Sequence, residues 1–142
     1  MLSGLLIRSP HIGKILDGRK IWEIRGRSTA KRGLIALIQS GTGTVIGAAD
    51  LVAIVGPLSR SEFAANARKI GLTKTEAGAA RRLPYERTFG WVLKHPRRLK
   101  TPVPYSHPSG AIIWVNLRPA VQQAILRQLG RRTVSRRIPA GS

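Results

Sequence analysis

Three charged residues near the start of the chain, Lys20, Glu23 and Arg25, have types and a spacing that could do chemistry. Gly18 predicts a turn ahead of them, and the residues after it predict a strand. Because side chains alternate along a strand, Glu23 and Arg25 should share one face, roughly 7 Å apart. Lys20 stands at the mouth of the strand, where it can reach the same side. A lysine and an arginine would then surround one carboxylate, at a spot suited to binding an anion.

A second interpretation of these charges is a solvated strand face with weak ion pairs. Exposed ion pairs contribute only about 0–1 kcal/mol to stability, and they are common on strand surfaces. Under both interpretations Trp22 and Ile24, which alternate with the charged residues, should point into a core. The spacing alone leaves both interpretations open.

The segment ahead of this strand predicts an apolar strand over residues 5–8 and a short helix over residues 11–16. Ser9 is expected to cap that helix, followed by a proline in its first turn. A helix N-terminus carries a positive partial charge and free N–H groups, which favour anions. We therefore expect the strand–helix junction to contribute further side chains to one ligand pocket, although a surface role for the histidine stays open: Arg8, Ser9, His11 and Lys14.

The stretch Gly18-x-Lys20-x-x-Glu23-x-Arg25 resembles the G-x-K-x-x-E-x-R signature of the ASCH (activating signal cointegrator homology) family, in the PUA-like superfamily. Other blocks resemble the family's strands in the same order and spacing. They are residues 5–10, 33–51, 95–105 and 110–115, so the resemblance covers roughly residues 3 to 118.

This resemblance implies a PUA-like β-barrel with a cleft beside the first helix and the signature strand. ASCH domains are thought to bind RNA or DNA in that cleft. Some proteins that resemble the family act as ribonucleases, and a small branch hydrolyses acyl-cytidine nucleosides. That branch has a threonine where this chain has Glu23, so the resemblance disfavours amidohydrolase activity here.

The whole pattern predicts an α+β fold, a small closed or nearly closed β-barrel of about six strands with short helices between them and a C-terminal helix. Residues 1–118 are expected to form the barrel, residues 119–130 a helix packed on it, and residues 131–142 a flexible basic tail. Further strands are predicted at residues 34–38, 45–55, 89–93, 99–103 and 111–117, and helices at 59–70, 73–82 and 119–129.

Two of these features matter for the site. The helices predicted between residues 59 and 88 form an insertion across one side of the sheet. Residues 94–98 predict a basic turn between two strands, and the arginines in this turn complete the expected ligand-binding set: Arg97 and Arg98.

Charge is the strongest property of the composition. Lys and Arg number 25 against 6 Asp and Glu, a formal charge of +19. Such a field attracts polyanions, and nucleic acid is the expected partner. An anionic membrane surface is less favoured because the body of the chain holds no long basic amphipathic helix. A further interpretation also stays open, in which the basic composition accompanies no specific binding site.

The chain has no cysteine, which excludes disulfides, zinc–thiolate sites and thiol catalysis. No apolar run approaches the length of a membrane span, and the first residues show no signal-peptide pattern. We therefore expect a cytoplasmic protein with no membrane partner, and a monomer rather than an oligomer.

Binding of RNA in the basic cleft is the predicted function. Lys20 and Arg25 would hold phosphate or a base edge, Glu23 would accept from an exocyclic amine, and Trp91 and Tyr105 would stack on a base. Trp22 and Trp114 are instead expected in the core.

Two alternatives stay open, a ribonuclease and a DNA-binding interaction module. A ribonuclease would use Lys20 and Glu23 as catalytic residues. It could also use Mn or Mg, although the six acidic residues are spread along the chain and predict no metal ligand set. Without metal, cleavage would draw its acid and base from His11, His95 and Lys20. No other cofactor is expected.

Overall fold

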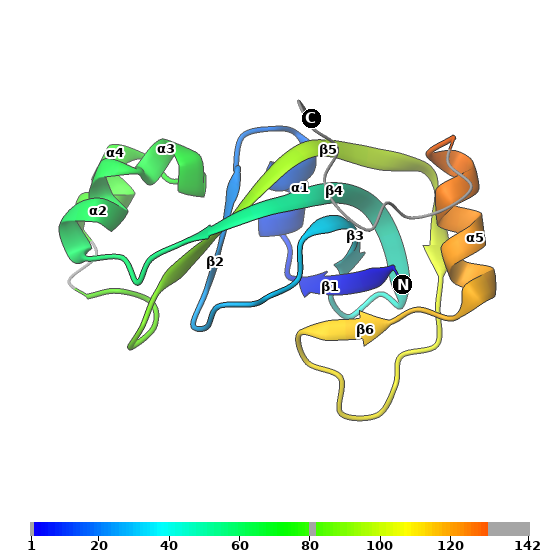
Figure 1. The fold of residues 1–142 in the computed structure, drawn as a ribbon. Coiled ribbons are helices and arrows are strands. Elements are labelled where there is room, and N and C mark those ends of the chain that lie inside the picture. Colours follow the sequence, from blue (N-terminus) through cyan, green and yellow to red (C-terminus); the bar gives the residue numbers. More distant parts are fainter. Residues whose placement is uncertain (1, 80–81, 131–142) are drawn as a thin grey trace.

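A six-stranded sheet, curled into a half-barrel, forms the centre of the protein (Figure 1). The structure is a computed structural model and describes residues 2–79 and 82–130. The strand order is β2-β5-β4-β3-β1-β6, with β1 parallel to β3 and all other neighbours antiparallel. The strands are β1 Ser3–Ile7, β2 Trp22–Arg25, β3 Gly33–Gln39, β4 Thr44–Val55, β5 Phe89–Pro104 and β6 Trp114–Asn116.

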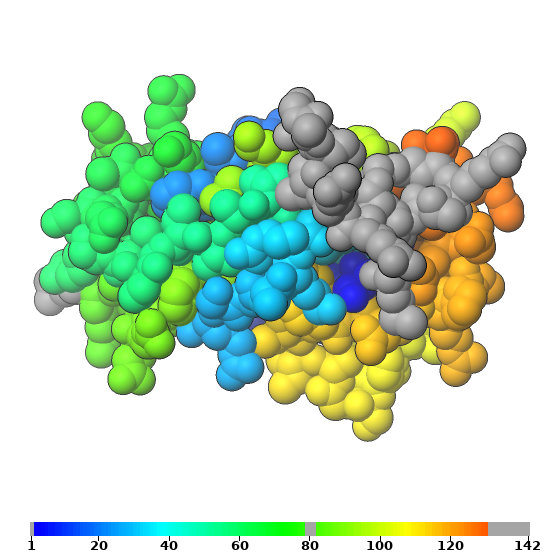
Figure 2. Space-filling model, viewed as in Figure 1, coloured from blue at the N-terminus to red at the C-terminus, as the bar shows by residue number. Residues whose placement is uncertain are grey.

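The predicted α+β class with about six strands is confirmed, and the barrel is left open, because the outer strands β2 and β6 are not hydrogen-bonded to each other. Short helices lie between the strands, and a longer one follows β6. They are α1 His11–Leu16, α2 Arg60–Ala65, α3 Ala67–Ile70, α4 Lys74–Ala79 and α5 Pro119–Gln128. The insertion helices and α5 lie at opposite ends of the molecule (Figure 2).

Both faces of the sheet are buried at β3, which explains why the sequence of this strand is an almost unbroken run of apolar residues. Leu34, Ala36 and Ile38 point to the core that includes α5, while Ile35 and Leu37 point to the core that includes α1. Helix α5 therefore packs on one face of the sheet and helix α1 on the other.

A third apolar cluster fixes the insertion to β2. Trp22 is buried against Leu58, Phe63 and Ile70, with Ile24 packed at its side. The predicted inward direction of Trp22 and Ile24 is confirmed, and the core that they face is the one formed with the insertion. The opposite face of β2 is left for its charged residues.

The predicted basic turn at residues 94–98 is wrong, because β5 runs without a break from Phe89 to Pro104. It pairs with β4 along this length, and three register shifts let the two strands bend together. His95, with φ of +53°, adopts the left-handed backbone region inside this strand. A run of basic residues and a proline thus marks a bend in one long strand.

Three smaller expectations also change. Ser9 does not cap α1, since Pro10 occupies the cap position and no side chain bonds there. The helix predicted over residues 59–70 divides at Asn66, although its capping box of Ser59 and Glu62 is present. The last strand is limited to β6, and Ile112 ahead of it is exposed.

The close approach of α1 to β4 predicts a cost for any side chain at Gly47. A Cβ there would collide with the Leu16 side chain and would lie 2.8 Å from the Arg97 carbonyl oxygen. Gly47→Ala should therefore destabilise the protein by about 1–3 kcal/mol through overpacking, measured by urea denaturation. Gly78→Ala in α4 is the control, because its Cβ meets nothing within 4 Å and alanine favours a helix. Equal urea midpoints for the two variants would contradict the prediction.

Candidate functional site

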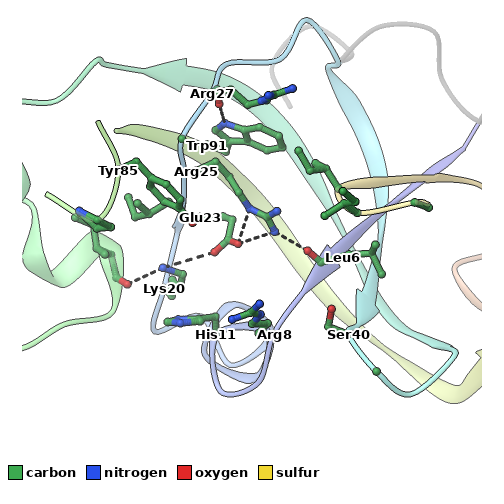
Figure 3. A pocket seen from close by; sticks show the side chains of 18 of the residues that line it. Leu6, Arg8, His11, Lys20, Glu23, Arg25, Arg27, Ser40, Tyr85 and Trp91 are labelled. Carbon is green, nitrogen blue, oxygen red and sulfur yellow. Dashed lines mark hydrogen bonds and ion pairs between the residues drawn. The ribbon is translucent and has the colours of Figure 1, made fainter. Parts of the chain in front are cut away.

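A cavity of about 1150 Å³ lies on the open side of the half-barrel, between β2 and the segment that precedes β6. Among the described residues, six parts of the chain line it: the end of β1 with the start of α1, the signature strand with the residues after it, the segment 40–43, the insertion, Trp91 of β5, and the segment 105–113. Figure 3 shows the signature side chains in the middle of this cavity.

The charged triad of Lys20, Glu23 and Arg25 gathers at one spot, as the first interpretation predicts. Arg25 Nε and Nη2 lie 3.0 and 2.9 Å from Glu23 Oε2, and Lys20 Nζ lies 3.8 Å from Glu23 Oε1. Lys20 and Glu23 are only 3% and 6% exposed. The alternative of a solvated surface pair is therefore wrong.

Hydrogen bonds to the backbone hold the triad in place from two sides. Arg25 Nη2 donates to the carbonyl oxygen of Leu6 in β1 at 2.6 Å, across the open side of the curled sheet. Lys20 Nζ donates to the carbonyl oxygen of Ile70 at 2.9 Å, at the end of α3. The triad thus joins β2, β1 and the insertion around the cavity (Figure 3).

Burial shifts the pKa of two cavity groups. It lowers the pKa of Lys20, and the carboxylate of Glu23 opposes that shift. Burial also lowers the pKa of His11, followed by repulsion from the positive charge of Lys20. The imidazole of His11 is therefore neutral near pH 7.

The predicted ligand-binding residues divide into two groups. Those that line the cavity are Arg8, His11, Lys20, Glu23 and Arg25, and those that do not are Ser9, Lys14, Arg97 and Arg98.

Two of the residues outside the cavity, Lys14 and Arg98, are bonded elsewhere. Lys14 Nζ donates to the Gly71 carbonyl oxygen at 3.0 Å, so it stabilises the C-terminal end of α3. Arg98 forms an ion pair with Asp17 at 2.9 Å, beyond the far end of α1. His95 pairs with Asp50 at 2.9 Å and also lies away from the cavity.

The predicted stacking role of Trp91 is wrong. Its ring is 1% exposed, lies 5.7 Å from the stacked ring of Trp114, and is covered by the guanidinium of Arg25 at 5.7 Å. Its indole N–H donates to the Arg27 carbonyl oxygen. Trp91 therefore packs as a core residue that supports the triad.

Tyr105 does line the cavity, and a short hydrogen-bond chain orients it. His107 Nε2 lies 2.9 Å from the Ala111 carbonyl oxygen, which can only accept. In the neutral ring Nε2 must therefore carry the hydrogen, and Nδ1 accepts from the Tyr105 hydroxyl at 2.9 Å. Burial raises the pKa of Tyr105, so this hydroxyl stays protonated near neutral pH.

Among the lining residues that sequence reasoning missed, four have side chains that could contact a ligand: Arg27, Tyr85, His107 and Ile112. Arg27 carried a usable signal, because it continues the cationic run just beyond the signature strand. The others come from the insertion and from the loop before β6, and no local spacing links those segments to the triad.

The described residues do not fit a divalent-metal site. Within residues 2–79 and 82–130, no three His, Cys, Asp or Glu side chains come together as metal ligands. Glu23 is the one carboxylate among the cavity's lining residues, and two cations already engage it. In the same part of the chain, no helix has the length and apolar character needed to cross a membrane.

The triad predicts a measurable coupling between Glu23 and Lys20. Glu23→Gln removes the charge that raises the pKa of Lys20, so this pKa should fall further below its usual value. A pH titration of the Lys20 side chain by NMR would measure the change. Asp50→Asn is the control, because that carboxylate pairs with His95 instead. An unchanged Lys20 titration in Glu23→Gln would show that the two groups are not coupled.

Comparison with known proteins shows likeness in structure. No protein-family model matches the sequence, and no curated protein matches it. Among solved structures, ASCH from Zymomonas mobilis matches with a TM-score of 0.65 and 17% identity, over 96% of this chain and 97% of the other.

Two variants of the Zymomonas mobilis protein match in the same way. Its serine-to-alanine variant has a TM-score of 0.66 and 18% identity, over 88% of this chain and 94% of its own. Its tyrosine-to-phenylalanine variant has a TM-score of 0.64 and 18% identity, over 88% of this chain and 96% of its own. The resemblance indicated by the G-x-K-x-x-E-x-R motif is thereby confirmed in the fold, and the chain is an ASCH-fold protein.

Proposed function

We propose that this protein binds single-stranded RNA in the cavity around the charged triad. The observation that supports this most directly is the charge of the cavity, which four cations line against one carboxylate: Arg8, Lys20, Arg25, Arg27 and Glu23. A site of this composition attracts a polyanion, and the +19 charge of the chain adds a long-range field of the same sign.

The cations have different parts in this proposal. Lys20 and Arg25 are already bonded within the protein, so they hold the shape and charge of the cavity floor. Within the described part of the chain, the guanidinium groups of Arg8 and Arg27 have no hydrogen-bond or ion-pair partner. They lie at opposite ends of the cavity, with the triad between them (Figure 3). A strand that crosses the cavity would place its phosphates on these two arginines.

The size and shape of the site favour a single strand. The cavity is of the order that takes a nucleotide-sized group, and its aromatic and aliphatic lining suits an unstacked base. Proteins that read RNA usually target such unpaired segments, because the major groove of duplex RNA is too narrow for side chains. The ASCH fold adds support, since the family signature lines the same cavity.

Arg8→Ala should weaken binding to a single-stranded RNA and lower the slope of log affinity against log salt by about 0.7, the value for one lost phosphate contact. Arg127→Ala is the matched control. This substitution removes the same charge, but Arg127 is exposed on α5 and lies outside the cavity. Fluorescence anisotropy over a salt series would measure both. Equal losses would show that RNA binds the surface without using the cavity, and tighter binding of a matched DNA strand would favour the DNA-binding alternative.

Ribonuclease activity is a second candidate function, supported by the neutral state of His11 in the cavity. A neutral imidazole can take the proton of a ribose 2′-hydroxyl. The 2′-oxygen then attacks the adjacent phosphorus, and the 5′-oxygen leaves and takes up a proton, which yields a 2′,3′-cyclic phosphate and a 5′-hydroxyl. Lys20, whose ammonium group is held beside Glu23, would position the phosphate in this reaction, and no metal is required.

The pH profile tests this activity. In the presence of EDTA, cleavage should be level near pH 7 and fall about tenfold per pH unit below the pKa of His11, which is lower than its usual value of 6.5. His11→Ala should reduce cleavage by roughly 10²–10⁴-fold, while His95→Ala, outside the cavity, should not. An unchanged cleavage rate in His11→Ala, or products without a cyclic phosphate, would exclude this mechanism.

A further inference from the structure

Exposed apolar side chains concentrate at the mouth of the cavity. Among the described residues, three large hydrophobic side chains are exposed: Ile21 at 40%, Tyr85 at 45% and Ile112 at 81%. Two of them, Tyr85 and Ile112, line the cavity. Exposed apolar groups gathered at a cavity, rather than scattered singly over a surface, indicate contact with a ligand.

Tyr85 is held in a defined position although it is exposed. A Cβ on Gly26 would lie 2.8 Å from Tyr85 Cδ1 and 3.1 Å from Cγ, so the ring rests directly on the backbone that follows Arg25. The hydroxyl of Thr88, which is fully buried, donates to the Tyr85 carbonyl oxygen at 3.1 Å. A ring fixed in this way loses little conformational freedom when a flat ligand covers it.

Ile112 borders the cavity from the opposite edge of the sheet, next to β6. The residues on both sides of it are anchored, since the Ala111 carbonyl oxygen accepts from His107 and the Ile113 carbonyl oxygen accepts from the Leu6 N–H at 3.0 Å. Its side chain nevertheless stays in solvent. The backbone thus presents an aliphatic group on the β6 side of the cavity and an aromatic ring on the β2 side.

We propose that the ring of Tyr85 is the stacking face of a slot for one unstacked nucleobase of RNA, with Ile112 as an apolar contact on the other side of the same cavity. The assignment rests on the proposed binding of RNA. It follows from the charge around the slot, since the unpaired guanidinium groups of Arg8 and Arg27 line the same cavity and can hold the phosphates on either side of that base. Stacking on an aromatic ring tolerates every base, so the slot adds affinity without choosing a sequence.

The experiment compares two labelled oligomers of about ten nucleotides, one an RNA and the other a ribose-phosphate chain of equal length without bases. Tyr85→Ala should weaken binding of the RNA about tenfold or more and leave the base-free oligomer and the salt slope unchanged. Tyr85→Phe keeps the ring and should bind like the wild type. Ile21→Ala is the control for loss of an exposed apolar side chain outside the cavity.

Gly26→Ala provides an independent test of position. Its Cβ would displace the Tyr85 ring without removing it, and Gly26 has no positive φ that alanine would strain. It should cause the same loss on RNA alone, and urea denaturation of each variant would confirm that the fold is retained.

The outcomes separate the two proposals. Wild-type protein that binds neither oligomer would overturn the proposed function, and the slot with it. Wild-type protein that binds RNA while Tyr85→Ala binds it equally well, or loses both oligomers equally, would overturn the slot alone. Tighter binding of a matched DNA strand with the same dependence on Tyr85 would overturn the assignment of the base to RNA.

Discussion

The hydrogen bond from Arg25 to the Leu6 carbonyl oxygen is the contact on which the site depends. It joins β2 to β1, two strands that are separated by three others in the sheet, and so it spans the open side of the half-barrel. Glu23 orients the guanidinium for this bond, since its Oε2 accepts from Arg25 Nε–H and forms an ion pair with Nη2. The cavity therefore has a floor of fixed geometry, although the sheet itself does not close.

Burial of this network costs free energy, because two of its three charges lie almost out of water. Hydrogen bonds to Leu6 and Ile70 offset part of that cost. A core of apolar residues at the same positions would serve stability at least as well. The charged triad is thus better explained by the positive, well-ordered surface that it gives the cavity than by any contribution to folding.

Part of the strong positive charge is used inside the fold. Lys14 and Lys20 bind the last carbonyl groups of α3, while Lys31 and Lys69 lie 5.1 Å from the rings of Trp114 and Trp22. These cations gain from a helix dipole or from an aromatic face, and Lys20 is the one of the four that also pairs with a carboxylate, that of Glu23.

The sequence predicted those parts of the site that depend on local periodicity. Alternation along β2 was enough to put Glu23 and Arg25 on one face and Trp22 on the other. The parts that depend on distant segments could not be predicted in this way. Nothing near Tyr85 in the sequence indicates that its ring lies on Gly26, because that contact exists only after the insertion folds over β2.

Other errors had physical causes of the same kind. The run at residues 94–98 has the composition of a turn, but its partner β4 is long enough to pair with all of β5, and tertiary pairing overrides local preference. Trp91 has the residue type of a stacking platform, and only its neighbours Trp114 and Arg25 show that its ring is already covered.

The attachment of the insertion to the triad has a consequence for how such proteins can diversify. Lys14 and Lys20 bind α3 through the backbone carbonyl oxygens of Gly71 and Ile70. Docking at this point requires a helix that ends there on a left-handed glycine and keeps Ala67 and Ile70 on its buried face, but it places little demand on the exposed side chains of the helix. The insertion can accumulate substitutions on its outer surface, and so acquire new selectivity, while the two lysines keep it in register with the cavity.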